Sequence, residues 1–166
     1  MLVELVQLAQ MMEKPLQKEY LALAPLVDEV MGQVRRIRPD VEVEYLNEVG
    51  PHCLVCDREL LQTILYSLVD NAVAYRKTVP QVKPQVRVSA LAKGSYLEIS
   101  VEDNGIGIDP KAQGKVFDLF YRATERSVGH GLGLYLASEA AHRLGTQLQL
   151  KPLPQGSLFW LRLPLH

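Results

Sequence analysis

Two pairs of strands joined by short turns constrain the fold of this chain more than any other feature. In the first pair, "VRVSALA" and "YLEISVED" alternate apolar and polar residues on either side of "KGS", and a second pair flanks "LPQG" near the C-terminus. Such alternation predicts half-buried strands, and the intervening turn residues predict hairpins. Stretches with helical spacing accompany these strands. The sequence therefore predicts an α+β fold, a two-layer sandwich whose mixed, mostly antiparallel sheet has helices on one face.

Apolar residues at helical spacing predict further elements along the chain. The first three helices are expected from Leu2 to about Met12, from Leu23 to Arg38 and from Arg58 to Arg76. Asp57 is placed to cap the third of them. Residues 41–48 and 52–56 are predicted as strands around the turn "VGP". Residues 109–127 are predicted to form one or two short helices, and a last helix is expected to end at Gly145.

The bulk composition favours one domain without an overall charge bias, so that any anion binding must come from local clusters. The 166 residues are 48% hydrophobic and 22% charged, and 18 Lys and Arg balance 19 Asp and Glu to a net charge of −1. This balance gives no reason to expect nucleic acid or an anionic membrane as a partner. The first residues, "MLVELVQLAQMMEK", lack a basic flank and include Glu4, so they predict neither a signal peptide nor a membrane span. A cytoplasmic protein is expected.

The two cysteines, Cys53 and Cys56, form the motif "CLVC". It resembles a redox or zinc pair, but the sequence offers no second pair and no suitable histidine. Residues three apart on a strand also lie on opposite faces. Both cysteines are therefore predicted to be small hydrophobic core residues.

The long helix predicted over 58–76 has one unusual face. Thr63, Ser67, Asn71 and Ala74 follow helical spacing and form a ribbon of small or polar side chains, where a solvated face would have long charged ones. The amide of Asn71 offers a carbonyl oxygen to Mg²⁺ and N–H donors to phosphate. The alternative is that small side chains let this helix pack closely on a neighbour.

The strand "YLEISVED" is followed directly by "NGIGI". Alternation places Leu97, Ile99 and Val101 inward and therefore puts Asp103 on the core side at the strand end. A buried carboxylate needs hydrogen-bond donors, which a ligand amino group can supply. Two glycines, Gly105 and Gly107, would let a flat ring approach the backbone. The alternative is a plain turn in which Asp103 accepts from its own backbone.

Glycines and basic residues gather between 115 and 133. Gly129, Gly131 and Gly133 precede the last helix, which suits anion binding by backbone N–H groups at a helix start. The pattern fits neither a phosphate-binding P-loop nor a dinucleotide fingerprint. Cations and aromatic residues near these glycines would suit a lid over phosphate: Lys115, Phe117, Phe120, Tyr121, Arg122, Arg126 and His130. The alternatives are a plain glycine-rich loop and a solvated surface over buried rings.

In this order the motifs resemble the nucleotide-binding site of the GHKL superfamily, and within it the catalytic ATP-binding domain of sensor histidine kinases. The resemblance extends from about Leu23 to the C-terminus. "LVDNAVAY" is similar to the asparagine box, "DNGIGI" to the first glycine box, "VFDLFYR" to the phenylalanine box and "GHGLGL" to the second glycine box. It implies a Bergerat-type ATP-binding fold over residues 21–166. Residues 1–20 resemble the end of a dimerisation and phosphoacceptor hairpin.

The resemblance also implies a set of site residues. Asp103 would accept from the adenine amino group, Asn71 would bind Mg²⁺ with Ser67 beside it, and Arg122 would lie near the γ-phosphate. Asn71 and Arg122 would be the catalytic residues. The remaining implied ATP-binding residues are Tyr75, Gly105, Gly107, Ile108, Phe120, Gly129, His130, Gly131, Leu132, Gly133 and Ser157.

Two positions depart from the family pattern. Ser67 stands where the family has a second Asn or a Glu, and Ala74 stands where it commonly has a Lys or Arg that reaches phosphate. The four histidines also lack the acidic neighbour that follows a phosphoacceptor, so the chain is expected to be a fragment or a truncated protein, inactive alone.

The expected function is transfer of the ATP γ-phosphoryl group to a histidine on a separate helical hairpin. The alternatives are a pseudokinase that binds nucleotide as a sensor or scaffold, and an anti-sigma-factor kinase. The resemblance implies ATP and Mg²⁺ as ligands, and the phosphoacceptor helices and a response regulator as partners. It further implies a homodimer for the full-length protein and a monomer for this segment.

Overall fold

The computed structural model describes residues 2–119, 121 and 132–165. Its helices are α1 (Leu2–Glu13), α2 (Leu23–Ile37), α3 (Arg58–Ala74) and α4 (Gly133–Arg143). Its strands are β1 (Lys18–Ala22), β2 (Glu44–Glu48), β3 (Cys53–Asp57), β4 (Gln85–Lys93), β5 (Tyr96–Asp103), β6 (Gln149–Pro152) and β7 (Ser157–Pro164). All predicted helices outside residues 109–127 are present, with ends within two residues of those expected.

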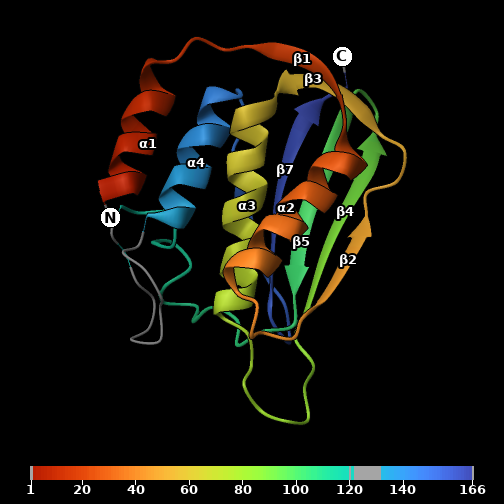
Figure 1. The fold of residues 1–166 in the computed structure, drawn as a ribbon, viewed down its shortest axis with the longest axis vertical. Helices are drawn as coiled ribbons and strands as arrows, with labels where there is room; N and C mark the ends of the chain where they lie inside the picture. Colours follow the sequence, from red (N-terminus) through yellow and green to blue (C-terminus); the bar gives the residue numbers. More distant parts are fainter. Residues whose placement is uncertain (1, 120, 122–131, 166) are drawn as a thin grey trace.

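The main sheet has five strands in the order β2-β4-β5-β7-β6. Only β2 and β4 are parallel, and every other neighbouring pair is antiparallel. Helices α2, α3 and α4 lie side by side over one face of this sheet (Figure 1). The predicted two-layer α+β sandwich is therefore confirmed, and so are both predicted hairpins, β4–β5 and β6–β7.

A second, two-stranded sheet was not predicted from the sequence. β1 pairs antiparallel with β3, with Tyr20 opposite Val55. As a result β2 and β3, although joined by a short turn at Gly50, belong to different sheets. The expected boundary between residues 20 and 21 lies within β1.

The core forms where the helix layer meets the sheet. Leu61, Leu65 and Leu68 of α3 and Ile99 of β5 are at most 1% exposed, as is Phe159 of β7. Burying each such side chain contributes about 1.5–3 kcal/mol. Every second residue of β5 is buried, from Leu97 to Asp103. The alternation that forms the core therefore also places the Asp103 side chain inside the molecule.

The start of α3 is fixed by the predicted cap. The Asp57 carboxylate accepts a hydrogen bond from the Leu60 backbone N–H at 3.1 Å. At the other end the Tyr75 N–H donates to the Asn71 carbonyl oxygen at 3.0 Å, which closes the last helical turn. This helix thus presents Ser67 and Asn71 from a well-anchored scaffold.

The prediction of short helices after Asp109 is wrong for the residues that the structure describes. Between 109 and 119 the backbone forms successive turns, in which Ala112, Lys115 and Asp118 donate to the carbonyl three residues earlier. The Asp109 carboxylate also accepts from the Lys111 N–H at 2.8 Å, a local bond that competes with helix formation.

The prediction for the cysteines holds for only one of them. Cys56 is 4% exposed, whereas Cys53 is half-buried, and both thiols are free. Burial raises the pKa of the Cys56 thiol to about 11. Cys53 departs from the prediction because its face of the β1–β3 sheet is open to solvent, as the exposure of Tyr20 and Val55 shows.

Helix α1 lies beside α4, outside the layer formed by the other helices (Figure 1). Met11 is its only buried residue among those described, and Leu2, Val3 and Val6 are exposed. Within the described chain no helix has both the length and the apolar character that crossing a membrane requires.

Candidate functional site

Asp103 ends β5 with its side chain inside the molecule, as predicted, and is 6% exposed. One carboxylate oxygen, Oδ1, accepts from the Gly105 N–H at 2.9 Å. The other, Oδ2, accepts from the Ser157 hydroxyl at 2.9 Å. The Asp103 carboxylate therefore points inward, as predicted, and it also accepts from the backbone of its own turn, as the alternative expected. Each carboxylate oxygen has a second lone pair, so the group can still accept from a ligand.

The pKa of Asp103 reflects two opposing causes. Burial raises it above the usual value, because the charged form loses its water. The hydrogen bonds from Gly105 and Ser157 stabilise the charged form and lower the pKa, but burial outweighs them. A carboxylate with raised pKa in a recess is typical of a ligand-binding position.

Glycines let three backbone segments meet around Asp103. A Cβ on Gly105 would lie 2.4 Å from the Tyr75 carbonyl oxygen, and one on Gly156 would lie 1.9 Å from the carbonyl oxygen of Asp103. Gly156 also has a φ of +94°, which side chains rarely adopt. The Ile106 N–H donates to the Tyr75 carbonyl at 3.0 Å. These contacts hold the end of α3, the loop after β5 and the start of β7 in one place.

Asn104 anchors the same loop from the outside. Its Oδ1 accepts from the Gln85 N–H at 2.8 Å, and its Nδ2 donates to the Lys83 carbonyl at 3.0 Å. The side chain therefore ties the loop after β5 to the start of β4.

A small pocket of about 50 Å³ lies against Asp103. It combines a carboxylate, an amide and a hydroxyl with apolar walls, which is the usual chemistry of a ligand pocket. The residues that line it are Asn71, Tyr75, Asp103, Gly107, Ile108, Asp109, Val116, Tyr121, Leu134 and Ser157. Six of these were predicted site residues: Asn71, Tyr75, Asp103, Gly107, Ile108 and Ser157.

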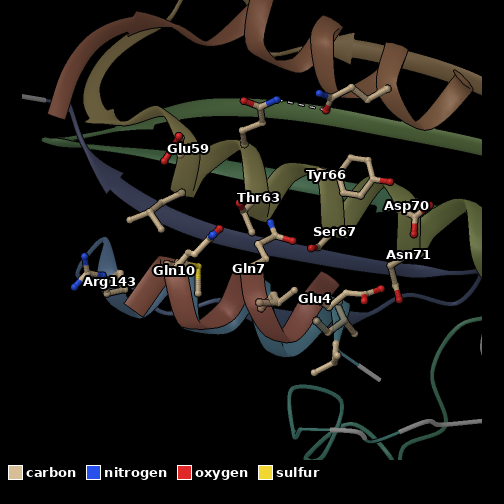
Figure 2. A pocket seen from close by; sticks show the side chains of 18 of the residues that line it. Glu4, Gln7, Gln10, Glu59, Thr63, Tyr66, Ser67, Asp70, Asn71 and Arg143 are labelled. Carbon is tan, nitrogen blue, oxygen red and sulfur yellow. Dashed lines mark hydrogen bonds between the residues drawn. The ribbon is translucent and has the colours of Figure 1, made fainter. Parts of the chain in front are cut away.

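A larger cavity of about 650 Å³ continues from this pocket between α1 and α3 (Figure 2). The two share Asn71, Tyr75, Val116, Tyr121 and Leu134 in their linings. The predicted residues Ser67, Leu132 and Gly133 line the larger cavity. Together the two spaces suit an elongated ligand with a flat end at Asp103 and a polar end beside α3.

The polar ribbon of α3 faces this cavity. Thr63, Ser67, Asn71 and Ala74 all line it, and Figure 2 shows Thr63, Ser67 and Asn71 along the side of α3 that faces α1. The ribbon therefore lines a cavity, and the alternative of close packing on a neighbouring helix does not apply to it. Small side chains on this face leave room for a ligand.

The donor set at Asn71 and Ser67 fits a hard cation. Both are half-buried, lie one helical turn apart on α3 and supply a carbonyl and a hydroxyl oxygen to the same cavity. Mg²⁺ prefers oxygen ligands, keeps several waters and takes few protein ligands. Among the described residues no group of three or more His, Cys, Asp or Glu side chains forms a metal site, so a cation here would depend on further oxygens from its ligand.

The remaining predicted residues are placed as follows. Gly105 contacts Asp103, since its N–H donates to the carboxylate and a Cβ on Gly105 would lie 3.0 Å from Oδ1. Phe120, Arg122, Gly129, His130 and Gly131 fall outside the described residues.

The structure also brings in lining residues that were not predicted. Gly156, Asp109, Val116 and Leu134 contact or line the pocket. Tyr121, which was expected in a lid over phosphate, also lines it. A sequence signal for Gly156 existed, since it ends the turn "LPQG" directly before β7.

Residues 56–166 match the family model described as histidine kinase-, DNA gyrase B-, and HSP90-like ATPase. The chain is 31% identical over 156 residues to the signal transduction histidine-protein kinase AtoS of Escherichia coli (strain K12), a match that covers 90% of this chain and 24% of AtoS. It is 34% identical over 145 residues to the sensor-like histidine kinase SenX3 of Mycobacterium tuberculosis (strain ATCC 25618 / H37Rv), covering 84% of this chain and 34% of SenX3.

Solved structures agree with this relationship. The structure of the mycobacterial sensor histidine kinase MprB matches with a TM-score of 0.75 and 25% sequence identity, covering 89% of this chain and 97% of that one. The chain spans about a quarter to a third of the length of the curated relatives it matches. It therefore belongs to the histidine kinase-, DNA gyrase B-, and HSP90-like ATPase family, as an ATP-binding catalytic domain of the sensor histidine kinase type.

Proposed function

We propose that the pocket at Asp103 binds the adenine of ATP. The observation that carries this proposal is the inward carboxylate of Asp103, held by Gly105 and Ser157 at the end of a pocket with apolar walls. An exocyclic amino group donates to a carboxylate, whereas a carbonyl at the same ring position would meet it with an acceptor. Tyr75 and Ile108 then flank the base, and Gly107 lets it approach the backbone.

The triphosphate occupies the larger cavity in this proposal. Asn71 and Ser67 would hold Mg²⁺ there, and the ion would neutralise charge that develops on the phosphates during transfer. Gly133 begins α4 at the cavity wall, where backbone N–H groups at a helix start favour an anion. Phe120, Arg122, Gly129, His130 and Gly131 are proposed to complete the phosphate site, as the resemblance implies.

The proposed reaction is transfer of the γ-phosphoryl group to a histidine on a separate helical hairpin. An imidazole nitrogen forms a bond to phosphorus while the bond between the γ-phosphorus and the bridging oxygen breaks, and ADP leaves with the electron pair. Asn71 and Asp103 contribute by positioning the nucleotide, which is the main source of catalysis in phosphoryl transfer. A response regulator would receive the phosphoryl group next. The full-length protein is proposed to be a cytoplasmically acting homodimer.

A second candidate function is nucleotide binding without turnover. Ser67 offers a hydroxyl where an amide or carboxylate is usual, and Ala74 offers no charge. Among the described residues, the cations that line the larger cavity are Lys14 and Arg143. Lys14 pairs with Glu59, and the Arg143 guanidinium donates to the Lys14 carbonyl oxygen, so both are engaged at the far end of α3. This arrangement is the observation behind a sensor or scaffold role, which is kept as the second candidate function.

Calorimetric titration with Mg-ATP tests the binding site. We expect wild-type protein to bind and Asp103→Asn to lose most of the affinity. Glu102→Gln is the matched control, since the neighbouring carboxylate pairs with Arg87 on the other face of β5. An unchanged dissociation constant for Asp103→Asn would contradict the adenine role.

A second experiment separates the two candidate functions. The hairpin of a cognate kinase is supplied with γ-labelled Mg-ATP, and phosphohistidine is measured. Labelling by the wild-type chain supports the kinase. Binding without labelling, followed by labelling with Ser67→Asn, supports nucleotide binding without turnover.

A further inference from the structure

Asp70 is a carboxylate on the same surface of α3 as Ser67 and Asn71, although its role was not predicted from the sequence. Ser67, Asp70, Asn71 and Ala74 are separated by three or four residues along α3, so they are the four corners of one patch on the helix surface. All four line the larger cavity, and Figure 2 shows Ser67, Asp70 and Asn71 on neighbouring turns. Asp70 therefore adjoins the two side chains whose oxygens fit a cation.

One oxygen of the Asp70 carboxylate is fixed by an ion pair. Arg38 follows the last residue of α2, and its Nε donates to Oδ1 of Asp70 at 2.8 Å. The two side chains are 19% and 30% exposed, so the pair is partly shielded from water. The backbone N–H of Arg38 donates to the Val34 carbonyl oxygen, which ties Arg38 to the end of α2. This ion pair therefore fixes the direction of the Asp70 side chain.

The other oxygen of Asp70, Oδ2, stays available for a ligand. Among the described residues, no side chain or backbone N–H donates a hydrogen bond to it. It is also not one of the buried polar atoms that lack a partner in the described part of the chain, so it is open to water. Carboxylates that bind metals are commonly held by a hydrogen bond from a second residue. Arg38 and Asp70 have this arrangement.

Charge distinguishes Asp70 from its neighbours on this patch. Ser67 and Asn71 are neutral donors, and Ser67 stands where the family has a second Asn or a Glu. Mg²⁺ is a hard cation that prefers carboxylate and other oxygen ligands. The Glu59 carboxylate lies three turns away on α3, where it pairs with Lys14. Asp70 therefore places a negative charge beside the two neutral oxygen donors.

We propose that Asp70 is a further metal-binding residue of the nucleotide site, and that its free oxygen joins Asn71 and Ser67 in holding Mg²⁺, directly or through one of the waters of the ion. The assignment rests on the proposed nucleotide site and adds a ligand to it. Arg38 orients the carboxylate for this role. Because a carboxylate repels phosphate, Asp70 favours nucleotide binding only when a cation lies between the two.

Calorimetric titration with AMPPNP in Mg²⁺ and in EDTA tests this assignment. The magnesium effect is the ratio of the dissociation constant in EDTA to that in Mg²⁺. Asp70→Asn removes the charge but keeps an oxygen that accepts from Arg38. We expect this variant to lower the magnesium effect about tenfold or more. In EDTA it should bind at least as tightly as wild type, because a repulsive charge is gone. A residue that only supports α3 would instead weaken both titrations alike.

Arg38→Met removes the ion pair from its other side and keeps the charge of Asp70. We expect its magnesium effect to be at least as large as that of wild type, since the carboxylate is still present. A loss as large as that of Asp70→Asn would show that the link between α2 and α3 is what matters, and would overturn the assignment. This variant also keeps the proposal falsifiable if Asp70→Asn does not fold.

Glu59→Gln is the matched control for charge. It removes one carboxylate from the lining of the same cavity, about 16 Å along α3 from Asp70. We expect it to leave the magnesium effect unchanged. If it lowers the magnesium effect as much as Asp70→Asn does, the cause is the net charge of the cavity, and the assignment of Asp70 is wrong.

Mn²⁺ provides a second readout that does not depend on comparing nucleotide affinities. Electron paramagnetic resonance of free Mn²⁺ measures its affinity for the protein saturated with AMPPNP. We expect Asp70→Asn to weaken this affinity about tenfold or more, and Glu59→Gln to leave it unchanged.

The outcomes separate this assignment from the proposed function. If wild-type protein does not bind AMPPNP in Mg²⁺, the proposed nucleotide site is wrong. If wild-type protein binds and Asp70→Asn has the wild-type magnesium effect and Mn²⁺ affinity, only the role of Asp70 is wrong.

Discussion

The Ser157 hydroxyl donates to Oδ2 of Asp103 at 2.9 Å, although the two residues are 54 positions apart in the chain. They face each other because β5 and β7 are antiparallel neighbours in which Asp103 is paired with Ser157. The register of the sheet therefore forms the pocket at Asp103. Any change that shifts β7 against β5 removes the donor from the carboxylate and disturbs the pocket without touching a ligand contact.

Replacing Asp103 by Asn should change how stability depends on pH. Burial raises the pKa of Asp103 in the folded protein. A raised pKa means that protonated Asp103 contributes to the unfolding free energy. This contribution is complete below the unfolded-state pKa of about 3.9 and is lost as the pH rises through the folded-state pKa. Asn does not titrate. We therefore expect the unfolding free energy of Asp103→Asn, relative to wild type, to increase with pH across this window and then level off.

Urea unfolding at a series of pH values measures this difference. At any single pH, the difference in unfolding free energy between the two proteins also includes changes in hydrogen bonding to Ser157. The informative quantity is therefore how this difference changes with pH. A difference that decreases with rising pH would mean that the folded-state pKa is lowered.

Gly156 is expected to tolerate no side chain. In Gly156→Ala the new Cβ would lie 1.9 Å from the Asp103 carbonyl oxygen, in a backbone conformation with φ of +94°. We expect a loss of more than about 3 kcal/mol in unfolding free energy and weaker nucleotide binding. Gly94→Ala is the matched control, because it has φ of +61° but nothing within 4 Å of its Cβ. Its cost should be about 1–2 kcal/mol, from the backbone alone.

Much of the fold follows from local patterns in the sequence. The hairpins, the long helix and its cap at Asp57 each depend on residues a few positions apart, so alternation and capping signals predict them. β1 was missed because four of its five residues are exposed and its partner β3 is far along the chain. Nothing in "KEYLA" alone distinguishes such a strand from an extended linker.

Those residues of the candidate site that belong to a single sequence motif could be predicted. Asp103 follows from strand alternation, and Asn71 from the polar ribbon of α3. The contacts of Gly156 and Tyr121 with the pocket at Asp103 were not predicted, because they depend on how distant segments pack. Likewise, nothing in residues 1–14 indicates that Gln7 and Gln10 would face Ser67 across a cavity, since that depends on where α1 docks.

Restoring the usual basic residue of the family at Ala74 should strengthen phosphate binding. Ala74 lines the larger cavity, so a lysine there extends into the proposed phosphate site. A charged hydrogen bond contributes about 1.5–3 kcal/mol, or roughly one to two decades in affinity. We expect Ala74→Lys to bind Mg-ATP about tenfold or more tightly, with a smaller gain for adenosine.

The comparison of ATP with adenosine in calorimetric titrations separates a phosphate contact from a general effect on the pocket. Ala92→Lys provides a control of equal charge, because Ala92 is exposed at the far end of β4. If both lysine variants strengthen ATP binding equally, the gain is long-range electrostatics and the placement of Ala74 beside phosphate is wrong.

The two thiols should react at very different rates. Burial raises the pKa of Cys56 to about 11, and its side chain is 4% exposed, whereas Cys53 is half-buried on the open face of the β1–β3 sheet. At pH 8 a thiol with that pKa is about one part in a thousand thiolate, the reactive form. Iodoacetamide followed by peptide mass analysis should therefore modify Cys53 first and Cys56 only after denaturant is added. Equal rates in the native protein would show that β3 opens readily, and Cys53→Ser should then leave a thiol that still reacts without denaturant.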